Sequence, residues 1–282
     1  MKCDLHIHSD YSTGSQSLVE IISEALSKDI SLISITDDDT MASYRELDSL
    51  SKRMGISYIK GVQVSASKDG QPFRLLAYGC ELEHEELSKL LQRNRQVWDN
   101  YGEKIITYMM DYYPELSLNG YRQHKKVPHY GGFKYNSYLN SLGLDGTDSA
   151  LVHFFKEHIE EMKNMVQKIP FAPIQDVINI IHDAKGKAII PGGYIRNLDS
   201  YISEADNLIS LGVDGLEVFS ASYDEQMSKV ARDYALKHNL LITGGGDGHG
   251  AWANQNTYAI GIRDVKFSEL QLGDIQIYPI NN

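Results

Sequence analysis

Short apolar segments alternate with amphipathic helical patterns through most of this 282-residue chain. The first segment, Cys3 to His8, precedes a helical pattern over Ser17 to Lys28 that Ser17 and Glu20 open with a capping box. One face of that pattern carries Leu18, Ile21, Ile22, Ala25 and Leu26. Further strand-like segments follow at residues 31–36, 58–65, 75–79, 187–190, 215–219 and 240–243. Repeated strand–helix units predict an α/β fold with parallel strands and ligands at the C-terminal strand ends.

Polar residues with metal-binding or catalytic chemistry fall at these predicted strand ends. They are His6, His8, Asp37, Asp38, Gln63, Ser65 and Asp247. Because the C-terminal ends of parallel strands meet at one edge, we expect these side chains to converge.

The alternation stops between about Glu81 and Gln167. A long polar helical pattern is followed there by a Tyr-, Gly- and Asn-rich stretch at about residues 121–148. This predicts one α/β barrel, formed by residues 1–80 and 170–282, that is interrupted by an inserted, mainly helical cap subdomain at residues 81–169.

Composition limits the partners and the location of the chain. The net charge of -11 argues against an extended nucleic-acid partner, because such proteins usually carry a basic face, although a nucleotide remains compatible. The start of the chain offers no apolar segment long enough for a membrane span, so we expect a cytoplasmic protein without a membrane partner. Cys3 and Cys80 lie in apolar runs and are predicted to be buried, reduced thiols.

The segment Asp4-Leu5-His6-Ile7-His8-Ser9 has the pattern of a metal site on a strand. Successive strand residues face opposite ways, so His6 and His8 point to the same side as Asp4. Two imidazoles on a rigid strand suit zinc, manganese or iron, and the distant Asp247-Gly248-His249 segment could complete the ligand shell. The alternative is a pair of hydrogen-bonded core histidines.

That opening segment resembles the first motif of the PHP (polymerase and histidinol phosphatase) phosphoesterases. The other motifs follow in order at Ile35-Thr36-Asp37-Asp38-Asp39-Thr40, Gly61-Val62-Gln63-Val64-Ser65, Gly215-Leu216-Glu217-Val218 and Gly244 to His249. The resemblance implies a distorted (β/α)7-type barrel, divalent metal ions and a phosphate-ester substrate.

Several positions depart from the family pattern. The family usually has His where Asp38 stands, Glu where Gln63 stands and commonly His where Arg74 stands, and it has a His-Pro pair near Pro191. Mapped onto this chain, the family's first metal keeps His6, His8 and Asp247, with Gln63 as a weak oxygen donor. The second metal has lost its ligands, and the third keeps His249 and could use Asp38.

The surviving ligands imply one or two divalent ions, among Mn, Zn, Fe and Mg. A neutral Gln63 cannot bridge two cations as a carboxylate does, and the oxygen ligand Asp38 favours manganese or magnesium relative to zinc. Asp38 and His249 are the candidate catalytic residues, which would hold a second ion or act in proton transfer. The competing interpretation of Asp37, Asp38 and Asp39 is turn chemistry and helix capping.

Three cationic residues are candidates for substrate binding. Arg74 could bind a phosphate where a metal is missing, or could simply pair with an acid at the surface. His129 and Lys134 belong to a locally basic stretch of the predicted cap, where they could reach a phosphate or form a solvated loop.

The resulting hypothesis is a metal-dependent phosphoesterase that hydrolyses a small phosphomonoester or nucleotide phosphate through metal-activated water. The alternative is a degenerate PHP-like protein that binds a metal or a phosphorylated ligand without turnover. A weaker third possibility is hydrolysis of a C–N or C–O bond, because amidohydrolases use the same ligand set.

Overall fold

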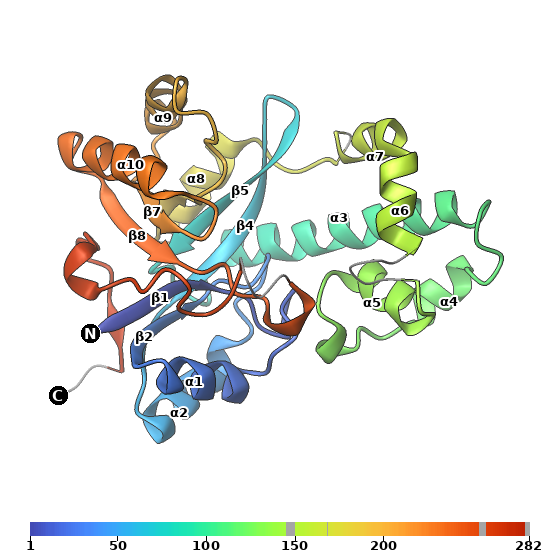
Figure 1. The fold of residues 1–282 in the computed structure, drawn as a ribbon, viewed down its shortest axis with the longest axis horizontal. Coiled ribbons are helices and arrows are strands. Elements are labelled where there is room, and N and C mark those ends of the chain that lie inside the picture. Colours follow the sequence, from blue (N-terminus) through green and yellow to red (C-terminus); the bar gives the residue numbers. More distant parts are fainter. Residues whose placement is uncertain (145–149, 168, 254–257, 280–282) are drawn as a thin grey trace.

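The computed structural model describes residues 1–144, 150–167, 169–253 and 258–279, which form a mixed α/β fold (Figure 1). One sheet has the strand order β1 (Lys2–Ile7), β2 (Ile30–Ile35), β3 (Ser57–Ile59) and β9 (Ile277–Tyr278). The other has the order β4 (Gly61–Lys68), β5 (Gln71–Tyr78), β6 (Lys187–Ile190), β7 (Gly215–Ser220) and β8 (Leu241–Gly245). The predicted α/β class is confirmed. The closed (β/α)7-type barrel is not, because the described strands form two separate sheets.

Helices cover the sheets as the apolar patterns predict. The first sheet packs on α1 (Leu18–Ser27) and α2 (Tyr44–Met54), and the second on α8 (Ile174–Asp183), α9 (Tyr201–Ser210) and α10 (Glu225–Lys237). The capping box of Ser17 and Glu20 is confirmed. Leu26, predicted to share the apolar face, is 37% exposed, whereas the other four residues of that face are buried. Single-turn 3-10 helices lie at η1 (Pro128–Tyr130), η2 (Gly250–Trp252) and η3 (Phe267–Glu269).

The prediction of parallel strands is right for part of each sheet. The pairs β1–β2, β2–β3, β6–β7 and β7–β8 are parallel. Strands β4 and β5 instead form an antiparallel hairpin, and β5 also pairs with β6 in the antiparallel sense. The hairpin turns at Asp69 and Gly70, whose φ angles of 52° and 75° suit a two-residue turn between twisted strands.

The strand predicted over residues 58–65 is two strands, β3 and β4, that belong to different sheets. The Tyr44 hydroxyl lies at the break, where it accepts the N–H of Gly61 at 2.7 Å and reaches the carbonyl of Ile59 at 3.0 Å. Because this hydroxyl takes the N–H of Gly61, the chain leaves the first sheet without losing a buried hydrogen bond.

The two sheets meet through isolated backbone bridges at Ile7–Gly248 and Asp38–Gln63. The segments that follow β1, β2 and β8 therefore converge beside the first half of β4. Gln63 and Ser65 lie within β4 rather than at its C-terminal end, so their predicted place at a strand end is wrong, although Gln63 still reaches the junction.

The described residues between β5 and α8 form helices joined by turns and loops. They contain α3 (Glu85–Met109), α4 (Leu118–Gln123), α5 (Lys134–Ser141), α6 (Ala150–Glu157) and α7 (Ile159–Val166). These helices stand to one side of the sheets (Figure 1) and share an apolar core that includes Ile105, Met109, Tyr121 and Phe154. Residues 145–148 of the predicted Tyr-, Gly- and Asn-rich stretch lie outside the described residues. The predicted subdomain boundaries at 81 and 169 stay a prediction.

The two cysteines agree with their predicted state. Cys3 and Cys80 are free and buried, and burial raises the pKa of each thiol to about 12. None of the described helices combines the length and the apolarity that crossing a membrane requires.

Candidate metal centre

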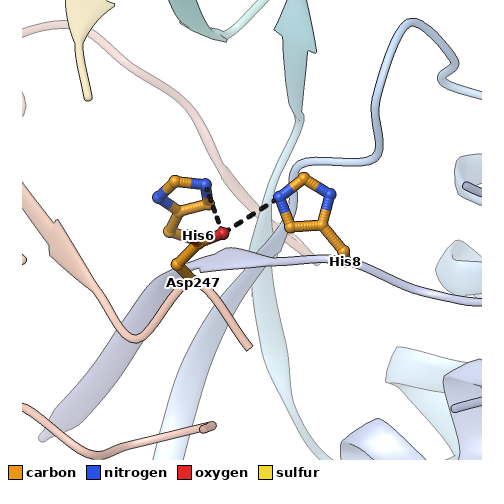
Figure 2. A group of neighbouring side chains, drawn as sticks. All are labelled: His6, His8 and Asp247. Carbon is orange, nitrogen blue, oxygen red and sulfur yellow. Dashed lines mark ion pairs between the residues drawn. The ribbon is translucent and has the colours of Figure 1, made fainter. Parts of the chain in front are cut away.

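The strand pattern of β1 brings His6 and His8 together with Asp247, as predicted (Figure 2). Leu5 and Ile7 are buried on the opposite side of the strand. The Nε2 atoms of His6 and His8 lie 3.2 Å and 3.3 Å from Oδ1 of Asp247. Ligands bound about 2.1 Å from one ion at ordinary coordination angles are themselves about 3.0–3.5 Å apart. The spacing of these three side chains therefore fits one divalent ion.

The buried imidazole nitrogens give a second test of this fit. Both side chains are almost completely buried, and neither Nε2 atom has a hydrogen-bond partner within the described part of the chain. Buried polar atoms in folded proteins are nearly always paired, with protein, water or an ion. A metal ion between the three side chains would satisfy both nitrogens and the Asp247 carboxylate together.

The turn that carries Asp247 is held in place by Asp4. This buried carboxylate accepts the N–H groups of His6 at 3.1 Å, Gly246 at 3.0 Å and Gly261 at 2.7 Å. Burial raises the pKa of Asp4 to about 6, against the opposing effect of these hydrogen bonds. Asp4 thus points to the predicted side of the strand, but it organises the backbone rather than joining the two histidines.

Glu217, on β7, is a functional candidate to which the sequence analysis assigned no role. Its side chain is 1% exposed, with Oε1 2.9 Å from Nδ1 of His6 and Oε2 accepting the N–H of Gly192 at 2.7 Å. A carboxylate at Nδ1 favours the tautomer that leaves the Nε2 lone pair facing Asp247. The signal in the sequence was a single acidic residue inside an apolar strand.

A second group with metal-ligand chemistry contains His8, Asp38 and His249. Nδ1 of His8 lies 3.4 Å from Oδ2 of Asp38, and the rings of His8 and His249 are stacked with centroids 4.1 Å apart and planes 18° apart. Nδ1 of His249 lies 2.8 Å from the carbonyl oxygen of Asp247. Five of the predicted ligands therefore converge, in two groups that share His8.

Asp38 is surrounded by hydrogen-bond donors and a cation. Gln63 donates from Nε2 to Oδ1 at 2.8 Å, and the Thr13 hydroxyl donates to Oδ2 at 2.5 Å. Nε of Arg74 lies 3.8 Å from Oδ1. Gln63, predicted as a weak oxygen donor to a metal, thus turns its amide nitrogen toward this group. Thr13 is another residue that the sequence analysis missed.

The surroundings of the two groups raise the pKa of His8 and lower the pKa of His249. Burial disfavours the charged form of His8, but Asp38 and Asp247 outweigh it and raise its pKa to about 10. Burial and then the neighbouring His8 lower the pKa of His249 to about 4. Burial opposes ionisation of Asp38, yet Arg74 and His8 hold its pKa well below the usual range. At neutral pH the centre combines an ionised Asp38 with a neutral His249.

The neighbours of Asp38 in sequence hold other segments of the chain in place. Asp37 accepts hydrogen bonds from the backbone and hydroxyl of Ser9. Asp39 accepts from Ser65, from Asn94 at 2.8 Å and from Trp98 at 3.2 Å. Because Asn94 and Trp98 belong to α3, Asp39 fastens the inserted helices to the junction beside the metal centre.

Arg74 lies on β5 between Asp38 and the inserted helices. Its guanidinium is 5.5 Å from the ring centre of Trp98 and 5.9 Å from that of Phe133, and its side chain is 31% exposed. The aromatic contacts fix the cation while part of it stays open to solvent. The structure therefore places Arg74 next to the metal centre, as predicted.

The contacts of His129 and Lys134 lie within the insertion. Nζ of Lys134 is 3.3 Å from the Arg122 carbonyl and 4.9 Å from the centre of the Tyr121 ring, so these contacts lie within the inserted helices. His129 is exposed and packs against Tyr130. Their predicted contact with phosphate stays a prediction.

No role was predicted for Lys126, but it reaches the loop at residues 10–13, which supplies Thr13 to Asp38. Its Nζ contacts the carbonyls of Ser12 and Asp10. The next turn of the insertion reaches the same loop, because the N–H of Gly132 donates to the Thr13 carbonyl at 2.7 Å. The inserted segment thus touches the loop that supplies Thr13 to Asp38.

Comparison with known proteins finds similar sequences and a similar fold. The family model described as "PHP domain" matches residues 4–169, which is more than half of the chain. A similar protein is a 5'-3' exoribonuclease of Haemophilus influenzae, 25% identical over 259 residues that cover 88% of this chain and 90% of the relative.

Two further relatives act on small phosphate esters by name. One is a phosphoribosyl 1,2-cyclic phosphate 1,2-diphosphodiesterase of Eggerthella lenta, 24% identical with 88% of this chain and 94% of the relative covered. The other is a 3',5'-nucleoside bisphosphate phosphatase of Chromobacterium violaceum, 25% identical with 87% and 86% covered. A solved structure from Bifidobacterium adolescentis, of a protein proposed to be a metal-dependent phosphoesterase, shares the fold with a TM-score of 0.73. It is 20% identical, with 94% of this chain and 97% of that chain covered.

Proposed function

The chain belongs to the PHP domain family, and from this premise we propose that it is a metal-dependent phosphoesterase that hydrolyses a small phosphomonoester or a nucleotide phosphate. The observation that carries the proposal is the pair of buried Nε2 atoms, on His6 and His8, that converge on Asp247 without hydrogen-bond partners in the described chain. A divalent ion held there supplies Lewis-acid activation of water and of a phosphoryl oxygen.

The residues around this group have separable tasks in the proposed reaction. Arg74, partly exposed beside Asp38, binds and orients the phosphate through its remaining N–H donors. His249 is neutral at physiological pH, and its Nδ1 lies beside the Asp247 carbonyl, so Nε2 is the atom that accepts a proton. Asp38 stays ionised and balances the charge of Arg74.

The proposed substrate class follows from charge and from the relatives. The fixed cation Arg74 beside the centre, in a chain of net charge -11, suits one or two phosphate groups better than a long phosphate backbone. Relatives named for a nucleoside bisphosphate and a phosphoribosyl cyclic phosphate agree with this size. Since another relative is named an exoribonuclease, an oligoribonucleotide belongs among the substrates tested.

A protein that binds a metal or phosphorylated ligand without turnover is the second candidate. The observation that favours it is the set of partners around Asp38. Gln63 and Thr13 donate hydrogen bonds to this carboxylate, and Arg74 lies beside it. Such a group offers less open coordination than a site with a bridging carboxylate.

Phosphate release from purified protein separates the two candidates. The assay uses nucleoside mono- and bisphosphates, sugar phosphates and a short oligoribonucleotide, with added Mn²⁺ or with a chelator. We expect phosphate release that requires the metal and is lost in His8→Ala. The control is His238→Ala, which removes an exposed histidine at the end of α10 and should behave as wild type. Bound metal without release from any substrate would favour the non-catalytic candidate.

A further inference from the structure

We infer that this centre holds a single ion through Nε2 of His6, Nε2 of His8 and Asp247, because Glu217 and Asp38 orient the two histidines from their Nδ1 sides. This inference rests on the proposed metal-dependent function. It assigns Glu217 as a positioning residue, and it makes Asp38 a positioning residue instead of a ligand to a second ion.

The two histidines are held in the same way. Each has a buried carboxylate on its Nδ1 side, Glu217 at 2.9 Å from His6 and Asp38 at 3.4 Å from His8, and each has Asp247 on its Nε2 side. The Thr13 hydroxyl, also 3.4 Å from Nδ1 of His8, donates its own proton to Asp38 and leaves an oxygen lone pair for the ring. A proton kept at Nδ1 leaves the lone pair of a neutral imidazole at Nε2. Both lone pairs then face the same carboxylate.

Sharing of His8 between the two groups limits the number of ions. A neutral imidazole has one lone pair, so His8 cannot bind one ion through Nε2 while it binds another through Nδ1. The group of His8, Asp38 and His249 is therefore an alternative to the group of His6, His8 and Asp247, and the two cannot be filled together in this arrangement.

Ring geometry decides between the alternatives. A metal ion lies close to the plane of the imidazole that binds it, along the nitrogen lone pair. His8 and His249 are stacked with planes only 18° apart, so an ion in the plane of one ring lies outside the plane of the other. His6 and His8 instead have a tilt of 49° with centroids 5.4 Å apart, and both direct Nε2 toward Asp247 (Figure 2).

The surroundings of Asp38 lead to the same choice. Both of its oxygens already accept hydrogen bonds, from Gln63 and Thr13, and Arg74 adds a positive charge 3.8 Å from Oδ1. An ion bound to Asp38 would compete with these donors for the carboxylate oxygens and lie close to the guanidinium. Coulomb repulsion between the ion and the guanidinium disfavours that arrangement. Arg74 therefore excludes a second cation from this side.

Metal stoichiometry tests the inference without relying on activity. The full chain is stripped with a chelator and titrated with Mn²⁺, and bound metal is counted by elemental analysis after gel filtration. We expect one ion per chain in wild type and His249→Ala, and none in His8→Ala. Two ions in wild type, with one lost in His249→Ala, would overturn the inference, as would no bound ion.

The role of Glu217 is tested by affinity and by ligand geometry. Glu217→Gln should still bind one ion but about 10–100-fold more weakly, the range expected when a ligand's orienting partner is changed. The exposed Glu115→Gln is the matched control and should bind as wild type. In the metal-free protein, ¹⁵N NMR of His6 should show the Nδ1–H tautomer or the imidazolium in wild type and a changed signal in Glu217→Gln. Unchanged affinity and an unchanged His6 signal would overturn the positioning role.

These outcomes are distinguishable from failure of the proposed function. One ion per chain with no phosphate release supports the single-ion inference and contradicts hydrolysis. Two ions with phosphate release supports hydrolysis and contradicts the inference.

Discussion

Gln63 donates a hydrogen bond of 2.8 Å from its amide nitrogen to Oδ1 of Asp38. This bond satisfies the Asp38 carboxylate on the side that faces β4, and it joins the two sheets where their backbones also bridge. A glutamate at position 63 would bring a second negative charge to the same place. The neutral amide therefore helps to set the number of cations that the centre can hold.

Gln63→Glu should increase the metal stoichiometry. Without metal, two carboxylates in contact repel each other and a donor is lost, so we expect the free energy of unfolding to fall by about 1–3 kcal/mol. Added Mn²⁺ should restore stability and raise the bound metal above the single ion inferred for wild type. Urea unfolding with and without Mn²⁺, together with metal counting, measures both effects. A stoichiometry that stays flat would contradict the role given to this amide.

Arg74→Ala should weaken recognition of the phosphate. Loss of a charged hydrogen bond costs about 1.5–3 kcal/mol, so kcat/KM should fall about 10–150-fold, mainly through KM. Arg93→Ala removes an exposed arginine of α3 and serves as the control. Steady-state kinetics of phosphate release provides the measurement. If Arg74→Ala keeps the wild-type KM, the cation serves only to pair with Asp38.

The contacts predicted for His129 and Lys134 require a separate test, because the structure places both within the insertion or at its surface. His129→Ala and Lys134→Ala should each raise KM if these residues meet the phosphate, with little change in the free energy of unfolding. Lys125→Ala, a change at an exposed lysine of the same basic stretch, is the control. Wild-type KM in both variants would restrict phosphate binding to the metal centre and Arg74.

The strand pattern of β1 shows how far sequence reasoning reaches. Alternation placed Leu5 and Ile7 in the core and aligned His6 with His8, because side-chain direction along a strand depends only on local geometry. The Asp69–Gly70 turn is also a local signal. It indicates the β4–β5 hairpin, which the prediction of parallel strands did not include.

Other features depended on contacts between distant segments. The break between β3 and β4 arises because the Tyr44 hydroxyl takes the N–H of Gly61, and no local pattern encodes that contact. The pairing of Glu217 with His6 links residues 211 positions apart. An acidic residue inside an apolar strand marks such a site, but its partner becomes visible only when the sheets are assembled.

Alkaline pH should destabilise the fold through Cys80. Burial raises the pKa of this thiol from its ordinary value of 9.0 to about 12. Above about pH 9 the unfolded chain loses the thiol proton while the folded chain keeps it, so stability falls as pH rises toward 12, by at most about 1.4 kcal/mol per pH unit. Urea midpoints between pH 8 and pH 10.5 should fall less steeply in Cys80→Ala. Equal slopes in the two proteins would contradict the buried, protonated thiol.

The most direct test of the metal centre is anomalous diffraction from crystals soaked in Mn²⁺. We predict one peak per chain, within about 2.0–2.4 Å of Nε2 of His6, Nε2 of His8 and a carboxylate oxygen of Asp247, with Asp38 still bonded to Gln63 and Thr13. A peak between Asp38 and His249, a second peak in the same chain, or no peak at the two Nε2 atoms would contradict this centre.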